Sequence, residues 1–251
     1  MQSKHHLALS LYSLFALVSG VEAQAVAPVL SPAADATAAS IEHIDLSVYA
    51  IAYAEGHQTV YLTDSQSAVS EIALSSANIL GPYHTVLDAN SNIILSSKTV
   101  TAEGTITYPT IAQATLSSHI KEPVMILVPS NESLPYQSII IDQSLEHFAM
   151  GSYMLINLSP MKLRGTVGSN QVEVSTEGVT TIIPSSEDED SLNVHFEYER
   201  PQGWKTFAHT RWMNEKSKRS LLLAYLDPRT KRMKIKGIPV KTIPVAHDAT
   251  P

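Results

Sequence analysis

The chain has 251 residues, of which 44% are apolar and 16% are charged, and its formal net charge is −7. This apolar content is too high for a disordered protein, and the length suffices for a core without disulfides or a structural metal. The sequence contains no cysteine, which excludes disulfides, thiolate nucleophiles, zinc fingers and cysteine-linked lipid anchors.

The first residues have the layout of a secretory signal peptide. A short basic head precedes an apolar stretch from Leu7 to Val18, and Val21 and Ala23 occupy the positions where signal peptidase requires small residues. The apolar stretch is shorter than the roughly 20 residues of a membrane span. We therefore predict a signal peptide over 1–23, a linker over 24–40, and export to the periplasm or the cell exterior without a transmembrane anchor.

From Ile44 onward the sequence has the residue pattern typical of β-strands. Short runs rich in Val, Ile, Leu, Tyr and Thr alternate with clusters of Gly, Pro, Asn, Asp and Ser. Helical periodicity is interrupted throughout, although 66–76 would suit a short helix. We expect a first series of strands at 44–53, 58–64, 69–75, 83–88, 92–100, 105–109, 123–128 and 136–142. A second series is expected at 152–158, 162–167, 170–174, 178–183, 192–199, 204–211, 219–226 and 232–238.

Turn chemistry predicts three hairpins, over 83–100, 192–211 and 219–238. The first turns through Asx side chains at 88–92, and the last turns at Asp227, where a proline sets the backbone angle at the next position. In the middle hairpin we expect Tyr198 to lie opposite Trp204, and Glu197 opposite Lys205.

Regular short strands with almost no helix predict an all-β fold of two β-sandwich, immunoglobulin-like domains. The polar stretch from Asp142 to His147 is the expected junction, and the loop from Pro129 to Pro135 is the alternative. The predicted domains are 41–143 and 144–240, followed by a flexible tail at 241–251.

Several segments of the C-terminal part resemble a set of exported bacterial proteins of unassigned function. They are the stretch from Phe148 to Ser159, followed by Gly165 and Gly168, and the segments Trp204–Trp212 and Tyr225–Pro228. The resemblance covers roughly 136–238. It implies export and a β-rich fold, and it carries no catalytic signature.

The charges are segregated along the chain. Residues 1–199 carry 21 acidic and 5 basic side chains, whereas residues 200–251 carry 3 acidic and 12 basic ones. On the strand at 232–238, alternate cations are predicted to project from one face. Such a basic stripe is suited to binding an anionic polymer. The predicted contact residues are Arg211, Lys216, Lys218, Arg219, Arg229, Lys231, Arg232, Lys234 and Lys236.

The alternative is that these cations meet the chain's own acids. The run Glu187–Asp190, together with Glu197 and Glu199, comes shortly before the basic segment. Exposed ion pairs of this kind contribute only about 0 to 1 kcal/mol each. Nucleic acid is not expected as a partner, because the chain is acidic overall.

Three residues of the middle hairpin form a weak metal prediction. His195 and Glu197 share one strand face, and His209 on the partner strand is placed to complete the site. Alternating polar residues on the solvent face of a strand are the simpler interpretation.

The residues also bear on two further functions, sugar binding and catalysis. Trp204, Phe207 and Trp212 would suit a sugar-binding platform, or else belong to the core. The sequence lacks the Gly-x-Ser-x-Gly, His-Glu-x-x-His and glycine-rich phosphate-loop patterns.

These observations favour an exported, non-enzymatic structural or adhesive protein of the cell envelope that needs no cofactor and contacts an anionic envelope polymer or a protein partner. The alternative is a hydrolase acting on envelope polymer through paired carboxylates or a histidine-bound metal, since such carboxylates are set by spatial separation.

Overall fold

The computed structural model describes residues 43–63, 69–88, 90–130, 132–185, 190–227 and 230–241. Every regular element in these ranges is a β-strand, which confirms the all-β prediction. None of the described segments forms a helix with the length and apolar character of a membrane span. The described residues belong to one compact unit.

Several predictions made from the sequence lie outside the described residues. They are the signal peptide at 1–23, the linker at 24–40, the tail beyond residue 241, most of the acidic run at 187–190, and Arg229.

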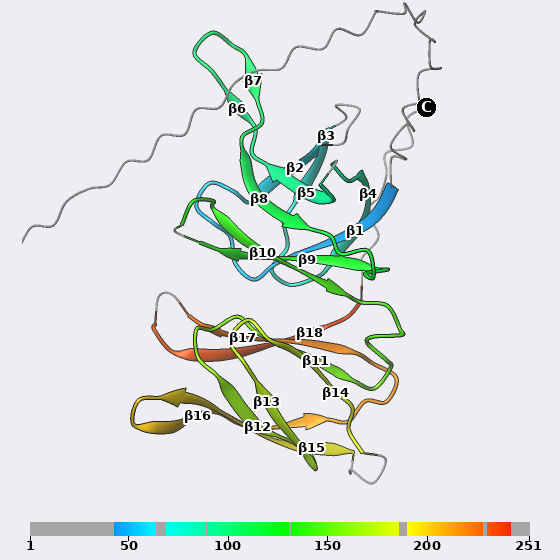
Figure 1. Ribbon diagram of the computed structural model, residues 1–251, viewed down its shortest axis with the longest axis vertical. Coiled ribbons are helices and arrows are strands. Elements are labelled where there is room, and N and C mark those ends of the chain that lie inside the picture. Colours follow the sequence, from blue (N-terminus) through cyan, green and yellow to red (C-terminus); the bar gives the residue numbers. More distant parts are fainter. Residues whose placement is uncertain are drawn as a thin grey trace, which may run out of the picture. The chain divides into compact units, whose positions relative to one another are not determined.

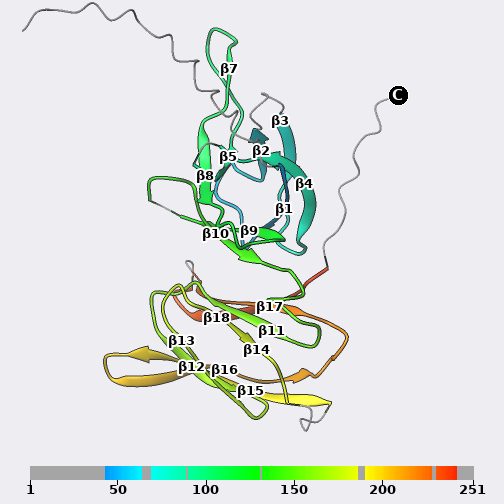
Figure 2. The ribbon, with the colours of Figure 1, turned by 45° about the vertical axis from the view of Figure 1, so that its right-hand side comes forward.

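The N-terminal half of the described chain forms two four-stranded sheets that face each other (Figure 1). Sheet I has the order β10-β9-β1-β4, and sheet II has the order β3-β2-β5-β8. A two-stranded ribbon, β6-β7, extends from sheet II (Figure 2). The strands are β1 His43–Ala50, β2 Thr59–Thr63, β3 Val69–Ala73, β4 Leu80–Val86, β5 Asn92–Ser96, β6 Thr99–Val100, β7 Ile106–Thr107, β8 Thr110–Thr115, β9 Pro123–Pro129 and β10 Tyr136–Asp142.

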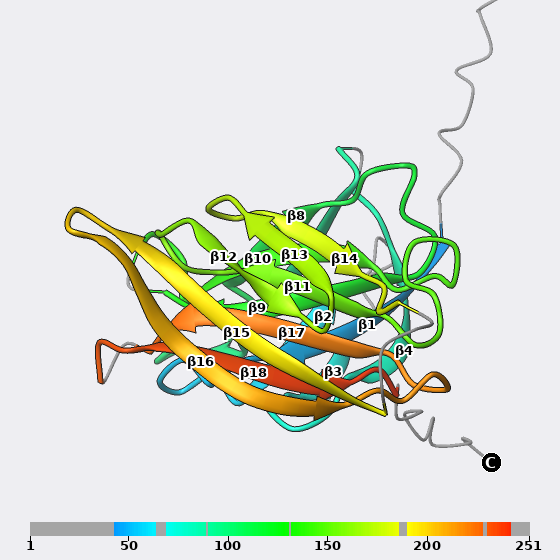
Figure 3. The ribbon, with the colours of Figure 1, turned by 90° about the horizontal axis from the view of Figure 1, so that it is seen from below.

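The C-terminal half forms a second pair of sheets. Sheet III has the order β14-β11-β17-β18, and sheet IV has the order β13-β12-β15-β16. The long β15–β16 hairpin runs along one side of sheet IV (Figure 3). The strands are β11 Tyr153–Asn157, β12 Leu163–Val167, β13 Asn170–Val174, β14 Val179–Ile182, β15 Ser191–Arg200, β16 Gly203–Met213, β17 Ser220–Leu226 and β18 Met233–Pro239.

The two sheet pairs have the same strand order. If the β6-β7 ribbon is set aside, the eight N-terminal strands and the eight C-terminal strands take the same places in their sheets. In each pair the first strand runs parallel to the seventh: Ser47 of β1 lies opposite Val124 of β9, and Met154 of β11 lies opposite Leu221 of β17. The β6-β7 ribbon is therefore an insertion into a repeated topology.

Each pair encloses an apolar core, and a third apolar cluster joins sheet I to sheet III. Leu46, Val60 and Leu95 belong to the N-terminal core, and Leu155, Val194 and Phe196 belong to the C-terminal core. The joining cluster is built from Tyr49, Val124, Ile126, Phe148, Met154, Ile156, Leu221 and Leu223. Strands β1, β9, β11 and β17 are therefore covered on both faces, which explains the nearly continuous apolar sequences of β9, β11 and β17.

A connecting segment at 143–152 links the two halves and is held by Arg219. The Arg219 guanidinium donates hydrogen bonds to the carbonyls of Gln143 at 2.6 Å and of Phe148 at 3.0 Å. It also lies 5.4 Å from the centre of the Phe148 ring. Arg219, which we expected to contact a ligand, is thus engaged in an internal contact.

Asp142 anchors the start of the same segment. Its carboxylate accepts hydrogen bonds from the backbone N–H groups of Lys121, Glu122 and Ser144 at 3.3, 3.1 and 2.9 Å. Burial acts to raise the pKa of Asp142, but these donors outweigh burial and leave the pKa below its ordinary value. A carboxyl group with a lowered pKa stabilises the folded state above its ordinary pKa, and this contribution disappears as the pH falls.

We expect Asp142→Asn to lower the free energy of unfolding by about 1 to 3 kcal/mol at neutral pH, because one accepting oxygen is replaced by a donor. The difference from the wild type should shrink as the pH falls from about 4, the ordinary pKa of the carboxyl group, through the lower pKa of the folded state. Chemical denaturation of both proteins at several pH values measures this. A difference that stays constant with pH would contradict the assignment.

Of the three predicted hairpins, the one at 219–238 forms as expected, from β17 and β18. The prediction of a hairpin at 83–100 is wrong. Asp88 does accept hydrogen bonds from the backbone N–H groups of Asn90 and Asn92, both at 2.8 Å. However, β4 pairs with β1 in sheet I, whereas β5 pairs with β2 and β8 in sheet II. Asx chemistry reverses the chain, but it does not select the pairing partner.

The middle hairpin forms from β15 and β16 with a different register from the one we expected. Tyr198 lies opposite Lys205 and Glu199 opposite Trp204, because the turn closes with Arg200 opposite Gly203. The register shifts again farther along, between Phe196 and Glu197. The sequence also failed to predict β8, and the short helix considered at 66–76 is contradicted by β3 over its described part.

Candidate functional site

The structure disperses the eight predicted cations that it describes. Lys234 and Lys236 share one face of β18, but Lys236 is directed towards the N-terminal half. Its Nζ donates a hydrogen bond to the Ser76 carbonyl at 2.7 Å and lies 5.6 Å from the centre of the Tyr49 ring. Burial lowers the pKa of Lys236. Lys236 is therefore an internal contact, like Arg219.

Two more of these cations are paired with acids. Lys234 forms an ion pair with Asp227, and Lys218 forms one with Glu215. The remaining described cations, Arg211, Lys216, Lys231 and Arg232, are exposed. The charge of these cations is thus partly used within the protein, although their partners Glu215 and Asp227 are not the acids that the sequence had suggested.

Arg211 and Lys218 meet at a pocket of about 360 Å³, which we call the basic pocket. It lies between β16 and β18, the edge strands of sheets IV and III. Its apolar wall includes Tyr153, Trp212 and Ile235. The basic pocket brings together residues from four strands, so no local motif could have revealed it.

The aromatic wall of the basic pocket is held by a backbone contact. The Tyr153 hydroxyl donates a hydrogen bond to the Met213 carbonyl at 2.8 Å, and the ring centres of Tyr153 and Trp212 are 5.4 Å apart. Burial, together with the charge of Glu215, raises the pKa of Tyr153. Tyr153 therefore stays a neutral hydrogen-bond donor in the physiological range.

The equivalent edges of the N-terminal pair are bridged instead. Ser138 of β10 donates a hydrogen bond through its Oγ to the carbonyl of Gln113 in β8 at 2.5 Å. The repeated topology is thus closed on this side in one half, whereas in the other half the same side carries the basic pocket.

The predicted metal residues do not form a metal site. The ring centres of His195 and His209 are 5.8 Å apart, and Glu197 is bound by Arg164, whose Nη2 and Nε both lie 2.8 Å from the same carboxylate oxygen. His195 Nε2 lies 3.0 Å from the Thr206 hydroxyl. Within the part of the chain that the structure describes, no group of three His, Asp or Glu side chains is arranged to hold a metal ion.

The three aromatic residues weighed as a sugar platform are divided between two environments. Phe207 and Trp212 pack against the C-terminal core. Trp204 is half-buried, with the Arg164 guanidinium 4.3 Å from its ring centre. The three rings therefore do not form one exposed platform.

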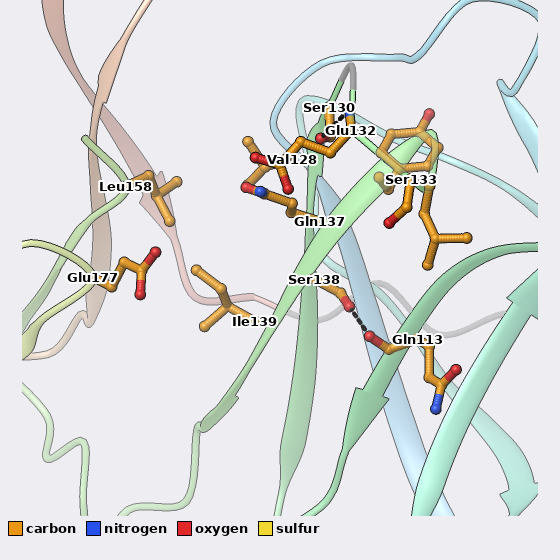
Figure 4. A pocket seen from close by; sticks show the side chains of 12 residues that line it. Gln113, Val128, Ser130, Glu132, Ser133, Gln137, Ser138, Ile139, Leu158 and Glu177 are labelled. Carbon is orange, nitrogen blue, oxygen red and sulfur yellow. Dashed lines mark hydrogen bonds between the residues drawn. The ribbon is translucent and has the colours of Figure 1, made fainter. Parts of the chain in front are cut away.

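A second pocket, of about 530 Å³, lies where the two halves meet, and we call it the acidic pocket (Figure 4). Leu158 and Glu177 lie on one side of it, and Val128, Gln137 and Ile139 lie on the other (Figure 4). Glu132 contributes a further carboxylate. Sequence reasoning missed this pocket entirely, because its walls come from segments that are distant in the chain.

Buried Asn157 positions one wall of the acidic pocket. Its amide nitrogen donates hydrogen bonds to the carbonyls of Met161 at 2.7 Å and Ser175 at 2.8 Å, and its oxygen accepts from the backbone N–H of Ser159 at 3.0 Å. These bonds hold the loop that follows Leu158 and the turn that carries Glu177.

The sequence matches no known protein family and no functionally curated protein.

Proposed function

We propose that this chain is an exported, non-enzymatic binding protein of the cell envelope, with two β-sandwich domains of immunoglobulin-like type, which binds an anionic polysaccharide at the basic pocket. The observation that carries this proposal is that Arg211 and Lys218 line one pocket together with Tyr153 and Trp212. Glu215 also lines this pocket and pairs with Lys218, so a bound anion would compete with Glu215 for that cation. The signal-like N-terminus and the resemblance to exported β-rich proteins support the location.

The chemistry of the pocket suits such a ligand. Guanidinium and ammonium groups bind carboxylates or sulfates through charge-assisted hydrogen bonds. Aromatic rings pack against the apolar faces of sugar rings. Tyr153 is buried, so the half-buried Trp212 is the aromatic side chain that a sugar would meet. Lys216 is exposed in the adjacent loop and adds positive charge near the pocket.

The test is a titration of the protein with polygalacturonate, followed by tryptophan fluorescence, with uncharged dextran as the control ligand. Loss of one charge-assisted hydrogen bond costs about 1.5 to 3 kcal/mol, so Arg211→Glu and Lys218→Gln should each raise the apparent Kd by about tenfold or more. Binding should also weaken as salt is added.

Arg200→Glu serves as the matched control, because Arg200 is exposed at the tip of the β15–β16 hairpin, outside the basic pocket. Its binding should equal that of the wild type. Equal affinity for dextran, or equal loss in all three variants, would overturn the proposal.

A further inference from the structure

The acidic pocket differs from the basic pocket in the charge that its walls present. None of the described residues that line it is Lys, Arg or His, whereas Glu132 and Glu177 contribute two carboxylates. Its apolar lining includes Val128 and Ile139 on one side and Leu158 on the other (Figure 4). A volume of about 530 Å³ lies within the range typical of small-molecule sites.

The two carboxylates are not engaged by other described residues. Among the described residues, neither Glu132 nor Glu177 has an ion-pair or hydrogen-bond partner for its carboxylate. Most acids near a cation are paired: Glu146 with Lys121, Glu173 with Lys162, Glu197 with Arg164, Glu215 with Lys218 and Asp227 with Lys234.

The backbone of Glu177 is also in an unfavourable conformation. Its φ angle is 57°, in the left-handed region that favours glycine. The turn is fixed by the hydrogen bond from Asn157 to the Ser175 carbonyl at 2.8 Å and by the one from the Gly178 N–H to the same carbonyl at 3.1 Å. A glycine would fit this backbone with less strain, and the residue present there is instead a glutamate that lines the pocket.

We propose that the acidic pocket binds a small aliphatic polyamine. Its ammonium groups would meet Glu132 and Glu177, and its methylene chain would cover Val128, Ile139 and Leu158. The Gln137 side chain, between the two carboxylate-bearing walls, offers a carbonyl oxygen as a further acceptor (Figure 4). Charge complementarity favours a cation over a neutral sugar, because the described lining carries two carboxylates and no cationic side chain.

The pocket draws its walls from both halves of the chain, since Glu132 belongs to the β9–β10 loop and Glu177 to the β13–β14 turn. A bound polyamine therefore links the two halves. Because such a ligand binds only the folded state, it raises the midpoint of thermal unfolding with increasing concentration. This site is separate from the basic pocket, so an experiment that refutes one proposal leaves the other unaffected.

The experiment is isothermal titration calorimetry of the full chain with spermidine, and with 1,8-octanediol as an uncharged aliphatic probe. We expect saturable binding of spermidine only. Glu132→Gln and Glu177→Gln should each weaken it by about tenfold, the loss expected for one charge-assisted contact. Glu122→Gln is the matched control, because Glu122 is exposed and does not line the pocket.

Glu177→Gly separates binding from folding. This variant removes the carboxylate and relieves the strained backbone, so its unfolding temperature should equal or exceed that of the wild type while spermidine binding is weakened. No saturable binding, equal binding by Glu122→Gln and the two pocket variants, or equal binding of the diol would each overturn the proposal.

Discussion

Replacing Gly165 with alanine should destabilise the protein by about 3 kcal/mol or more, a large part of the stability of a typical domain. Gly165 lies in β12, opposite Phe196 of β15. A Cβ at this position would lie 2.1 Å from the His195 carbonyl oxygen and 2.5 Å from a ring carbon of Phe196. Backbone cannot yield as a flexible side chain can, so the central strands of sheet IV would have to separate.

Thermal and chemical denaturation of Gly165→Ala measure this effect, and for a chain of this size the midpoint should fall by roughly 10 °C. Gly237→Ala in β18 is the matched control. A Cβ at Gly237 would meet its nearest neighbour, a Leu222 side-chain carbon, at an ordinary 3.6 Å. If both variants unfold at the wild-type temperature, the close approach of β12 to β15 is wrong.

The second large effect is expected at Asn157, which is fully buried and uses both ends of its amide. Asn157→Asp keeps the shape but replaces two donated hydrogen bonds with contacts between a carboxylate and the carbonyls of Met161 and Ser175. An uncompensated buried charge is strongly destabilising, so we expect a loss of about 3 to 5 kcal/mol at neutral pH. Acidification should recover part of it, because a protonated carboxyl donates one hydrogen bond.

Urea denaturation of Asn157→Asp at pH 7 and at lower pH tests this, with Asn193→Asp as the control. Asn193 is exposed on β15, and its carbonyl oxygen lies 3.4 Å from Arg211 Nε. Asn193→Asp should change stability little, since it gains a favourable charge pair at the surface. Equal stability of the two variants would contradict the buried network.

The candidate sites show which site residues can be identified from the sequence and which cannot. Arg211 and Lys218 could be nominated from charge alone, but their neighbours Tyr153 and Ile235 could not, because they come from other strands. Conversely, alternation along β18 correctly places Lys234 and Lys236 on one face. It cannot show that Lys236 contacts the N-terminal half of the described chain. A strand pattern specifies two faces, and only packing decides which face meets solvent.

The sequence by itself determined what depends on local interactions. Runs of branched and aromatic residues formed strands, and the Asp227 turn joined β17 to β18, because neighbouring segments meet at little cost in loop entropy. The tertiary structure decided what depends on distant partners. It placed β4 beside β1, introduced the register shift after Phe196, and formed both pockets from segments far apart in the chain. Those outcomes follow from the packing of whole sheets, in which many contacts of similar strength compete, so no short stretch of residues specifies them.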